Sequence, residues 1–150
     1  MAAQSSRFAQ RLAGHEQELK EKYMELYQDE KSYEELLSSM KDFYDKRSKE
    51  LKTLDEKREA NPDWFKDGNM LGVTMYTKLF AGGLKGLISH LDYLSEQGIT
   101  YLHLMPLLKM PHPFNDGGYA VEDFRMVDPE VGTNKDLQEL TKELRARGIS

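Results

Sequence analysis

The 150-residue sequence has no cysteine, no long apolar run and no basic block. Without cysteine it can form neither a disulfide nor a thiolate metal site, which fits a reducing compartment. No apolar run approaches the ~20 residues that span a bilayer, and the first residues lack the apolar core of a secretion signal. The net charge is −5, whereas binding to a phosphate backbone needs clustered basic side chains. We therefore expect a cytoplasmic protein whose partners include neither nucleic acid nor a membrane.

Glycine and proline are scarce in the first sixty residues. That part holds one of the 11 glycines, none of the five prolines and 26 charged side chains. The composition changes near Asn61-Pro62, and proline disfavours helix in the residue before it. Two different architectures are therefore expected in one chain. We assign a helical N-terminal domain to residues 1–66 and a second, incomplete domain to residues 67–150.

Apolar residues of the N-terminal part recur at helical spacing. One set ends at Tyr27, and a second follows one face from Tyr33 to Leu54. Ser32 and Glu35 have the spacing of a capping box, which predicts that the second helix begins at Ser32. We expect a helical domain packed on its own neighbours. The alternative is an arm that binds a partner or forms a coiled coil.

The remaining residues alternate between strand and helix patterns. Residues 71–76 and 99–105 are short apolar runs of strand length. Helical spacing runs from Leu84 to Leu94 before Gly98, and again after a cap at Thr133 to Asp136. This order is the repeating unit of parallel α/β folds. Two strands, with a third opening at residue 149, leave sheet edges unpaired, so we expect a truncated chain or one that pairs with other polypeptide.

Residues 106–132 form the long connection after the second strand. Structureless loops of this length are uncommon and usually functional or disordered, and parallel α/β barrels place their active sites at the carboxyl ends of the strands. Within the connection, Asp116 and Tyr119 flank a Gly-Gly pair. A carboxylate that accepts hydroxyl hydrogen bonds, beside an aromatic face, suits a sugar. The alternative is an ordinary tight turn with Tyr119 in the core.

The motifs of the second part, taken together, resemble those of amylosucrases, members of the α-amylase family (glycoside hydrolase family 13). The most specific are the Tyr-Leu-His-Leu-Met-Pro run of residues 101–106 and the alanine that follows Gly118-Tyr119. The matching segments are 79–87, 98–107, 116–121 and 127–133. The resemblance implies an all-helical N-terminal domain followed by the first two β/α units of a truncated (β/α)8 TIM barrel.

The resemblance also implies a function. The full enzyme would transfer the glucosyl unit of sucrose to an α-1,4-glucan and release fructose by a retaining mechanism, without a cofactor or a metal ion. Its Asp nucleophile and Glu acid/base come from later barrel strands, so this chain has no catalytic residue of its own and is expected to be inactive alone. Tyr119 would stack under the glucosyl ring, and Asp116 would close the pocket with an arginine from a late loop.

Two alternatives remain open at this stage. The chain could be part of a trehalose synthase or α-glucosidase of the same family, or a non-catalytic helical interaction module. Among other polar residues, we expect His103 to be a hydrogen-bonded core residue and Asp128 to fix the long connection through backbone N–H groups. His112 is isolated and has no spacing typical of metal ligands.

Overall fold

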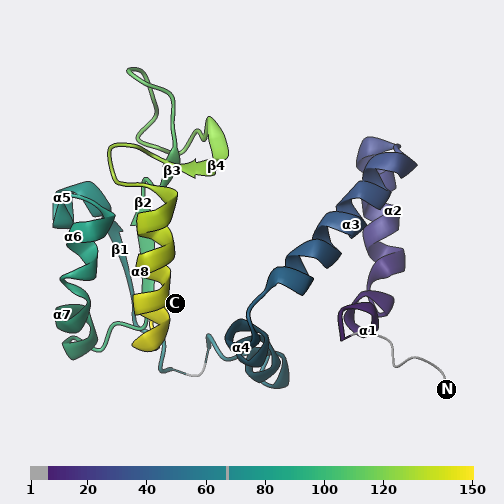
Figure 1. Ribbon diagram of the computed structural model, residues 1–150, viewed down its shortest axis with the longest axis horizontal. Helices are drawn as coiled ribbons and strands as arrows, with labels where there is room; N and C mark the ends of the chain where they lie inside the picture. The colour runs from purple at the N-terminus through teal and green to yellow at the C-terminus, as the bar shows by residue number, and fades with distance from the viewer. Residues whose placement is uncertain (1–6, 67) are drawn as a thin grey trace. The chain divides into compact units, whose positions relative to one another are not determined.

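The computed structural model describes residues 7–66 and 68–150 (Figure 1), and the chain divides between Asn61 and Pro62 into two compact units. Each unit has its own set of contacts and is described by itself. The domain boundary that we place after residue 66 stays a prediction. Within the described residues, no helix is both long enough and apolar enough to cross a bilayer.

The first unit is all-helical, as expected. Its helices are α1 (Arg7–Ala13), α2 (Glu16–Tyr27), α3 (Glu30–Lys46) and α4 (Lys49–Ala60). Tyr33 of α3 is 3% exposed, and its ring lies 5.5 Å from that of Tyr23 on α2. The Tyr23 hydroxyl donates to Ser32 Oγ at 2.9 Å. Apolar contact between tyrosine rings, closed by a hydrogen bond, therefore holds α2 against α3.

Two details of the helix predictions are wrong. Helix α3 begins at Glu30 because the Asp29 carboxylate accepts from the backbone N–H groups of Lys31 and Ser32. Asp29 thus takes the capping role that we assigned to Ser32. The apolar face that continues to Leu54 also spans two helices, because Arg47 is extended and Ser48 caps α4 through the Leu51 amide.

Ion pairs connect the helices of this unit. The Arg47 guanidinium, after α3, donates to both Asp55 oxygens on α4 at 2.6 and 2.7 Å. Arg11 and Arg7 of α1 both bind Glu59 of α4. The hydrogen bond from Arg11, with a further one from Arg7, lowers the pKa of Glu59 to about 2 despite the opposing effect of burial.

The second unit contains a parallel pair of strands and a small antiparallel pair. Strand β1 (Gly72–Tyr76) lies beside β2 (Tyr101–Met105), with Tyr76 opposite Met105. The helices are α5 (Thr77–Ala81), α6 (Leu84–Ile88), α7 (Leu91–Glu96) and α8 (Asn134–Ala146). The helix that we predict over 84–94 is divided between α6 and α7, since Ser89 and His90 interrupt it.

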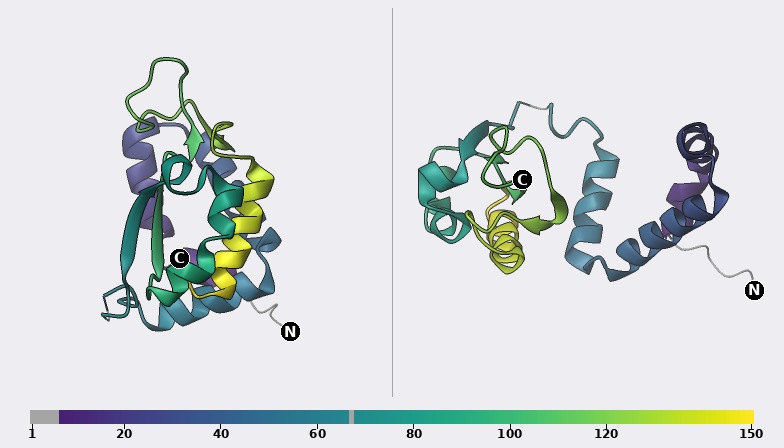
Figure 2. Two further views of the ribbon diagram at one scale, coloured as in Figure 1. Left: turned by 90° about the vertical axis from the view of Figure 1, so that its left-hand side faces the viewer. Right: turned by 90° about the horizontal axis from the view of Figure 1, so that it is seen from above.

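The core lies on one face of the parallel strands. Helices α6 and α8 cover that face (Figure 2), and Leu84, Leu87 and Leu140 are fully buried there. Full burial of one leucine side chain stabilises a fold by about 1.5–3 kcal/mol. Met75 and Leu102 point toward the helices and are each 8% exposed. Hydrophobic packing of helices on strands therefore holds this unit together.

The opposite face of β1 and β2 is open. Successive strand residues point to opposite faces, so His103, next to buried Leu102, lies on the uncovered side and is exposed. The prediction that His103 is a core residue is therefore wrong. Its apolar neighbours in sequence suggested burial on both faces, but the helices cover only one.

The second edge of β2 carries the beginning of a further ladder. Ser150 N–H donates to the Thr100 carbonyl at 2.9 Å, and Leu102 N–H donates to the Ser150 carbonyl at 2.8 Å. These two bonds have the parallel pattern. They agree with the prediction that a third strand opens at residue 149, and buried Ile149 adds its side chain to the core.

The connection over 106–132 is more ordered than predicted. Strand β3 (Leu108–Lys109) pairs antiparallel with β4 (Asp123–Val127), with an irregular register between Leu108 and Lys109. At its base, Glu122 N–H donates to the Lys109 carbonyl at 2.8 Å. The longest segment without helix or strand is therefore residues 110–122, which we call the site loop.

Candidate functional site

The site loop lies at the carboxyl end of β2. Figure 1 shows β3, β4 and this loop together at one end of the parallel strands. Gly118 is in contact with Pro106, the residue that follows β2: a Cβ atom on Gly118 would lie 2.3 Å from Pro106 Cβ. Gly118 also has φ of +91°, which favours glycine. The Gly-Gly pair therefore allows the loop to return onto the end of the strand.

Asp116 and Tyr119 are both exposed on this loop. The Asp116 carboxylate accepts from the Ala120 N–H at 2.8 Å, and the Asn115 side chain accepts from the Gly117 N–H at 2.9 Å. These bonds from side chain to backbone form a compact turn. Tyr119 is 72% exposed, so the structure does not support the alternative in which its ring packs in the core. Their role in sugar binding stays a prediction.

The buried carboxylate of Asp128 binds the first part of the site loop. Asp128, which follows β4, is fully buried. Its oxygens accept from the N–H groups of Met110 at 3.3 Å and Glu130 at 2.9 Å, and His112 Nε2 lies 3.1 Å away. Burial opposes ionisation, but hydrogen bonds from the Glu130 amide, His112 and the Met110 amide outweigh it and lower the pKa of Asp128. The prediction that Asp128 fixes the connection to backbone N–H groups is confirmed.

The far end of the connection joins the core through a helix cap. Thr133 Oγ1 accepts from the Asp136 N–H, and the Asp136 carboxylate accepts from the Thr133 N–H. This capping box confirms the cap predicted at Thr133 to Asp136. The Val131 carbonyl accepts from the Leu84 N–H at 2.8 Å. Both ends of the connection are therefore attached to buried parts of the unit.

Sequence reasoning missed two neighbours of the site. Tyr76 ends β1 opposite Met105, so it lies at the same end of the sheet, and it is 47% exposed. Strand register alone would have identified it. His112 contacts Asp128 across 16 residues of sequence, and no local pattern indicates that pairing. Within the described residues, no group of three His, Asp or Glu side chains is placed to hold a metal ion.

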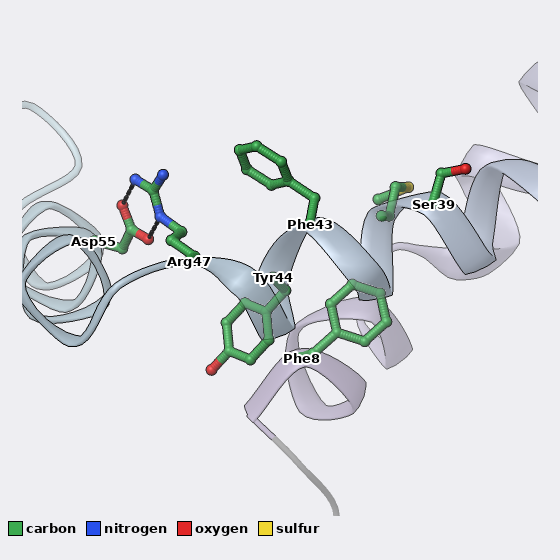
Figure 3. Close-up of a pocket in the computed structure, with 7 residues that line it drawn as sticks. Phe8, Ser39, Phe43, Tyr44, Arg47 and Asp55 are labelled. Carbon is green, nitrogen blue, oxygen red and sulfur yellow. Dashed lines mark hydrogen bonds and ion pairs between the residues drawn. The ribbon is translucent and has the colours of Figure 1, made fainter. Parts of the chain in front are cut away.

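The helical unit has a separate apolar pocket of about 580 Å³. Figure 3 shows Phe8, Phe43 and Tyr44 around it, with the Arg47–Asp55 ion pair at one side. The rings of Phe8 and Tyr44 are 5.7 Å apart. This pocket is lined largely by carbon atoms of α1 and α3, and it contains no cluster of acids or histidines that would perform chemistry.

Comparison with known proteins gives one family. Residues 59–150 match the family described as alpha amylase, catalytic domain. The chain is 35% identical over 95 residues to trehalose-6-phosphate hydrolase from Escherichia coli, covering 59% of this chain and 16% of that protein. It is 39% identical over 95 residues to the trehalose synthase/amylase TreS of Mycobacterium tuberculosis, covering 60% of this chain and 16% of TreS.

Solved structures agree with the sequence comparison. The trehalose-6-phosphate hydrolase of Bacillus licheniformis superposes with a TM-score of 0.51 and 30% identity, over 58% of this chain and 16% of that one. The chain thus spans about a sixth of the length of these relatives. Residues 72–150 form the first two β/α units of the (β/α)8 barrel of such enzymes. The chain therefore belongs to the α-amylase catalytic domain family.

Proposed function

We propose that the protein acts on α-linked glucosides and that Asp116 and Tyr119 bind the glucosyl unit. The observation that carries this proposal is the site loop: Gly118 contacts Pro106 at the end of β2, and the Tyr119 ring and Asp116 are both exposed on this loop. Hydroxyl groups of a sugar donate to a carboxylate, and the C–H face of its ring packs on an aromatic plane. Membership of the α-amylase family supports a sugar substrate.

The proposed reaction is retaining transfer of a glucosyl unit. In such reactions an Asp or Glu nucleophile and a second carboxyl group lie about 5–5.5 Å apart across the bond that is broken. We assign neither group to residues 1–150, since amylosucrase-like enzymes supply them from later barrel strands. The role of this chain is to hold the glucosyl ring, and the chain by itself is expected to be inactive.

For the donor we propose sucrose, with an α-1,4-glucan as acceptor and fructose as the leaving product. The support is the resemblance of residues 101–106 and of the Gly-Gly-Tyr-Ala segment to amylosucrases. A trehalose synthase or α-glucosidase is the second candidate. It is favoured by relatives described as trehalose synthase/amylase, trehalose-6-phosphate hydrolase and oligo-1,6-glucosidase. A cytoplasmic location stays part of the proposal.

Substrate assays on the complete product of the reading frame that contains codons 1–150 would separate these candidates. We expect fructose release and glucan growth with sucrose, and little conversion of trehalose or isomaltose. Interconversion of trehalose and maltose, with no fructose from sucrose, would favour the second candidate. Absence of turnover on all α-glucosides would contradict both.

Variants of the site loop test the binding role. Tyr119→Ala and Asp116→Asn should each lower kcat/KM about 10- to 100-fold, because stacking on an aromatic ring or a hydrogen bond to a charged group is lost. Phe114→Ala is the matched control, since Phe114 lies on the same loop and is 89% exposed. Equal losses in Phe114→Ala and Tyr119→Ala would show that Tyr119 has no specific role.

A further inference from the structure

One oxygen of a buried carboxylate binds the first limb of the site loop, residues 110–116. Asp128 Oδ2 accepts from the Met110 N–H at 3.3 Å and lies 3.1 Å from His112 Nε2. The other oxygen, Oδ1, accepts from the Glu130 N–H at 2.9 Å. The first limb of the loop is therefore joined through Met110 and His112 to Asp128, which is itself fully buried.

His112 supplies the part of this attachment that depends on a side chain. Met110 and Glu130 donate through backbone amides, whereas His112 donates through its imidazole. Its side chain is 39% exposed, so a smaller side chain there would remove a hydrogen bond without leaving a closed cavity. A hydrogen bond to a fully buried carboxylate is stronger than one between neutral groups.

The second limb, residues 117–122, has separate attachments. Glu122 N–H donates to the Lys109 carbonyl, and the Lys109 ammonium binds Glu122 at 3.0 Å. Between His112 and Glu122, the described contacts of the loop are its own turn at Asp116 and the approach of Gly118 to Pro106. The direction in which the first limb leaves β3 consequently depends on the contact between His112 and Asp128.

From this arrangement we infer that His112 is a positioning residue: through Asp128 it fixes the limb that leads to Asp116, and so sets the affinity for the glucosyl unit. The inference rests on the proposed function of Asp116 and Tyr119. It extends that function by assigning a role to a histidine that does not itself contact the sugar. The proposed sugar contacts remain those of Asp116 and Tyr119, and His112 determines the position of Asp116.

Two variants with side-chain amides, His112→Gln and His112→Asn, distinguish positioning of the loop from a general loss of stability. In His112→Gln the side-chain amide can donate from about the position of Nε2, whereas in His112→Asn it is one carbon shorter and does not reach Asp128. We expect hydrogen exchange of the site-loop amides that donate a hydrogen bond to a side chain, those of Met110, Gly117 and Ala120, to accelerate about tenfold in His112→Asn and His112→Ala of the full chain, and to stay near wild type in His112→Gln. Peptides from β1 and α8 should be unchanged in all three variants.

His15→Ala serves as the control, because His15 is an exposed histidine of the helical unit. Exchange of the site loop should be unchanged in it. Equal exchange rates in His112→Gln and His112→Asn would show that the hydrogen bond from His112 to Asp128 does not hold the loop, whatever the substrate of the protein.

Kinetics of the complete enzyme test the consequence for binding. His112→Asn should raise KM for the glucosyl donor about tenfold with a smaller change in kcat, and His112→Gln should restore KM. A loosened loop with unchanged KM would overturn the positioning role. Failure of the proposed function gives a different result: no α-glucoside is turned over by wild type, while the exchange experiment still decides whether His112 holds the loop.

Discussion

At the scale of single residues, Asp128 couples charge to structure in the second unit. Its pKa is lowered in the folded protein, below the ordinary value of about 3.9 in an unfolded chain. Ionised Asp128 therefore contributes stability that is fully present above about pH 4 and is lost as the pH falls through its folded pKa. The His112 contact and two backbone amides provide that contribution.

This coupling predicts a difference in acid sensitivity. The melting temperature of wild type should fall between about pH 5 and pH 2 more steeply than that of Asp128→Asn, which has no proton to gain at this position. At neutral pH the variant should be less stable by about 1–3 kcal/mol, because a charged acceptor is lost in a buried site. Parallel pH profiles of the two proteins would contradict the assignment.

Two neighbouring glycines of the site loop give a matched pair. Gly117 and Gly118 both have positive φ, of +84° and +91°. A Cβ at Gly117 meets nothing within 4 Å, whereas one at Gly118 meets Pro106 at 2.3 Å. Gly117→Ala should cost about 1 kcal/mol from backbone strain alone, and Gly118→Ala about 2 kcal/mol or more. Urea denaturation checks the order, and equal costs would show that contact with Pro106 does not matter.

At the scale of helices and strands, α8 contributes Leu140 and Leu144 to the core. Leu140 is fully buried between α8 and its neighbours, so Leu140→Ala should lower the free energy of unfolding by about 2–5 kcal/mol. Lys142→Ala on the exposed side of the same helix should change it by less than about 0.5 kcal/mol. Urea denaturation of both variants compares the two faces of α8, and similar losses would contradict this packing.

Element types were predictable because apolar periodicity reports which face is buried. The β-α-β order, the cap from Thr133 to Asp136 and the glycine end at Gly98 all follow from local sequence. Helix interruptions at Arg47-Ser48 and Ser89-His90 were not predicted, because the apolar faces continue through both breaks. At the first break the Ser48 cap, more than periodicity, determines where α4 begins.

The support of the candidate site was less predictable than its location. The carboxyl end of β2 and the glycine pair indicate where Asp116 and Tyr119 lie, since both follow from sequence order. The His112–Asp128 contact joins residues on opposite limbs of the connection. Nothing in the residues around either side chain specifies the other, because the fold of β3 and β4 brings them together.

At the scale of the whole molecule, the parallel strands of the second unit have one covered and one open face. Thr74 and His103 lie opposite each other in register, and both are exposed. Exposed strands with free edges pair with other chains. We expect the 150-residue chain to associate with rising concentration, and Thr74→Lys to weaken that association in sedimentation experiments. A stable monomer that unfolds cooperatively would favour the helical interaction module instead.

The 150-residue chain should also leave sucrose unconsumed, because the proposed catalytic carboxylates lie outside it. Incubation of the purified chain with sucrose, followed by a fructose assay, measures this directly. Fructose release above the rate in buffer would contradict the proposal that the catalytic carboxylates lie outside residues 1–150.

The attachments at His112 and Glu122 have a consequence for how this protein can change during evolution. Insertions or substitutions within residues 113–121 alter the tip of the loop while Asp128, β3 and β4 keep their contacts. Positions of this segment other than Gly117 and Gly118 can therefore vary without disturbing folding, as long as the two attachment points persist. Among descendants that keep the proposed site, variation should concentrate at the positions of that segment other than Asp116, Gly118 and Tyr119.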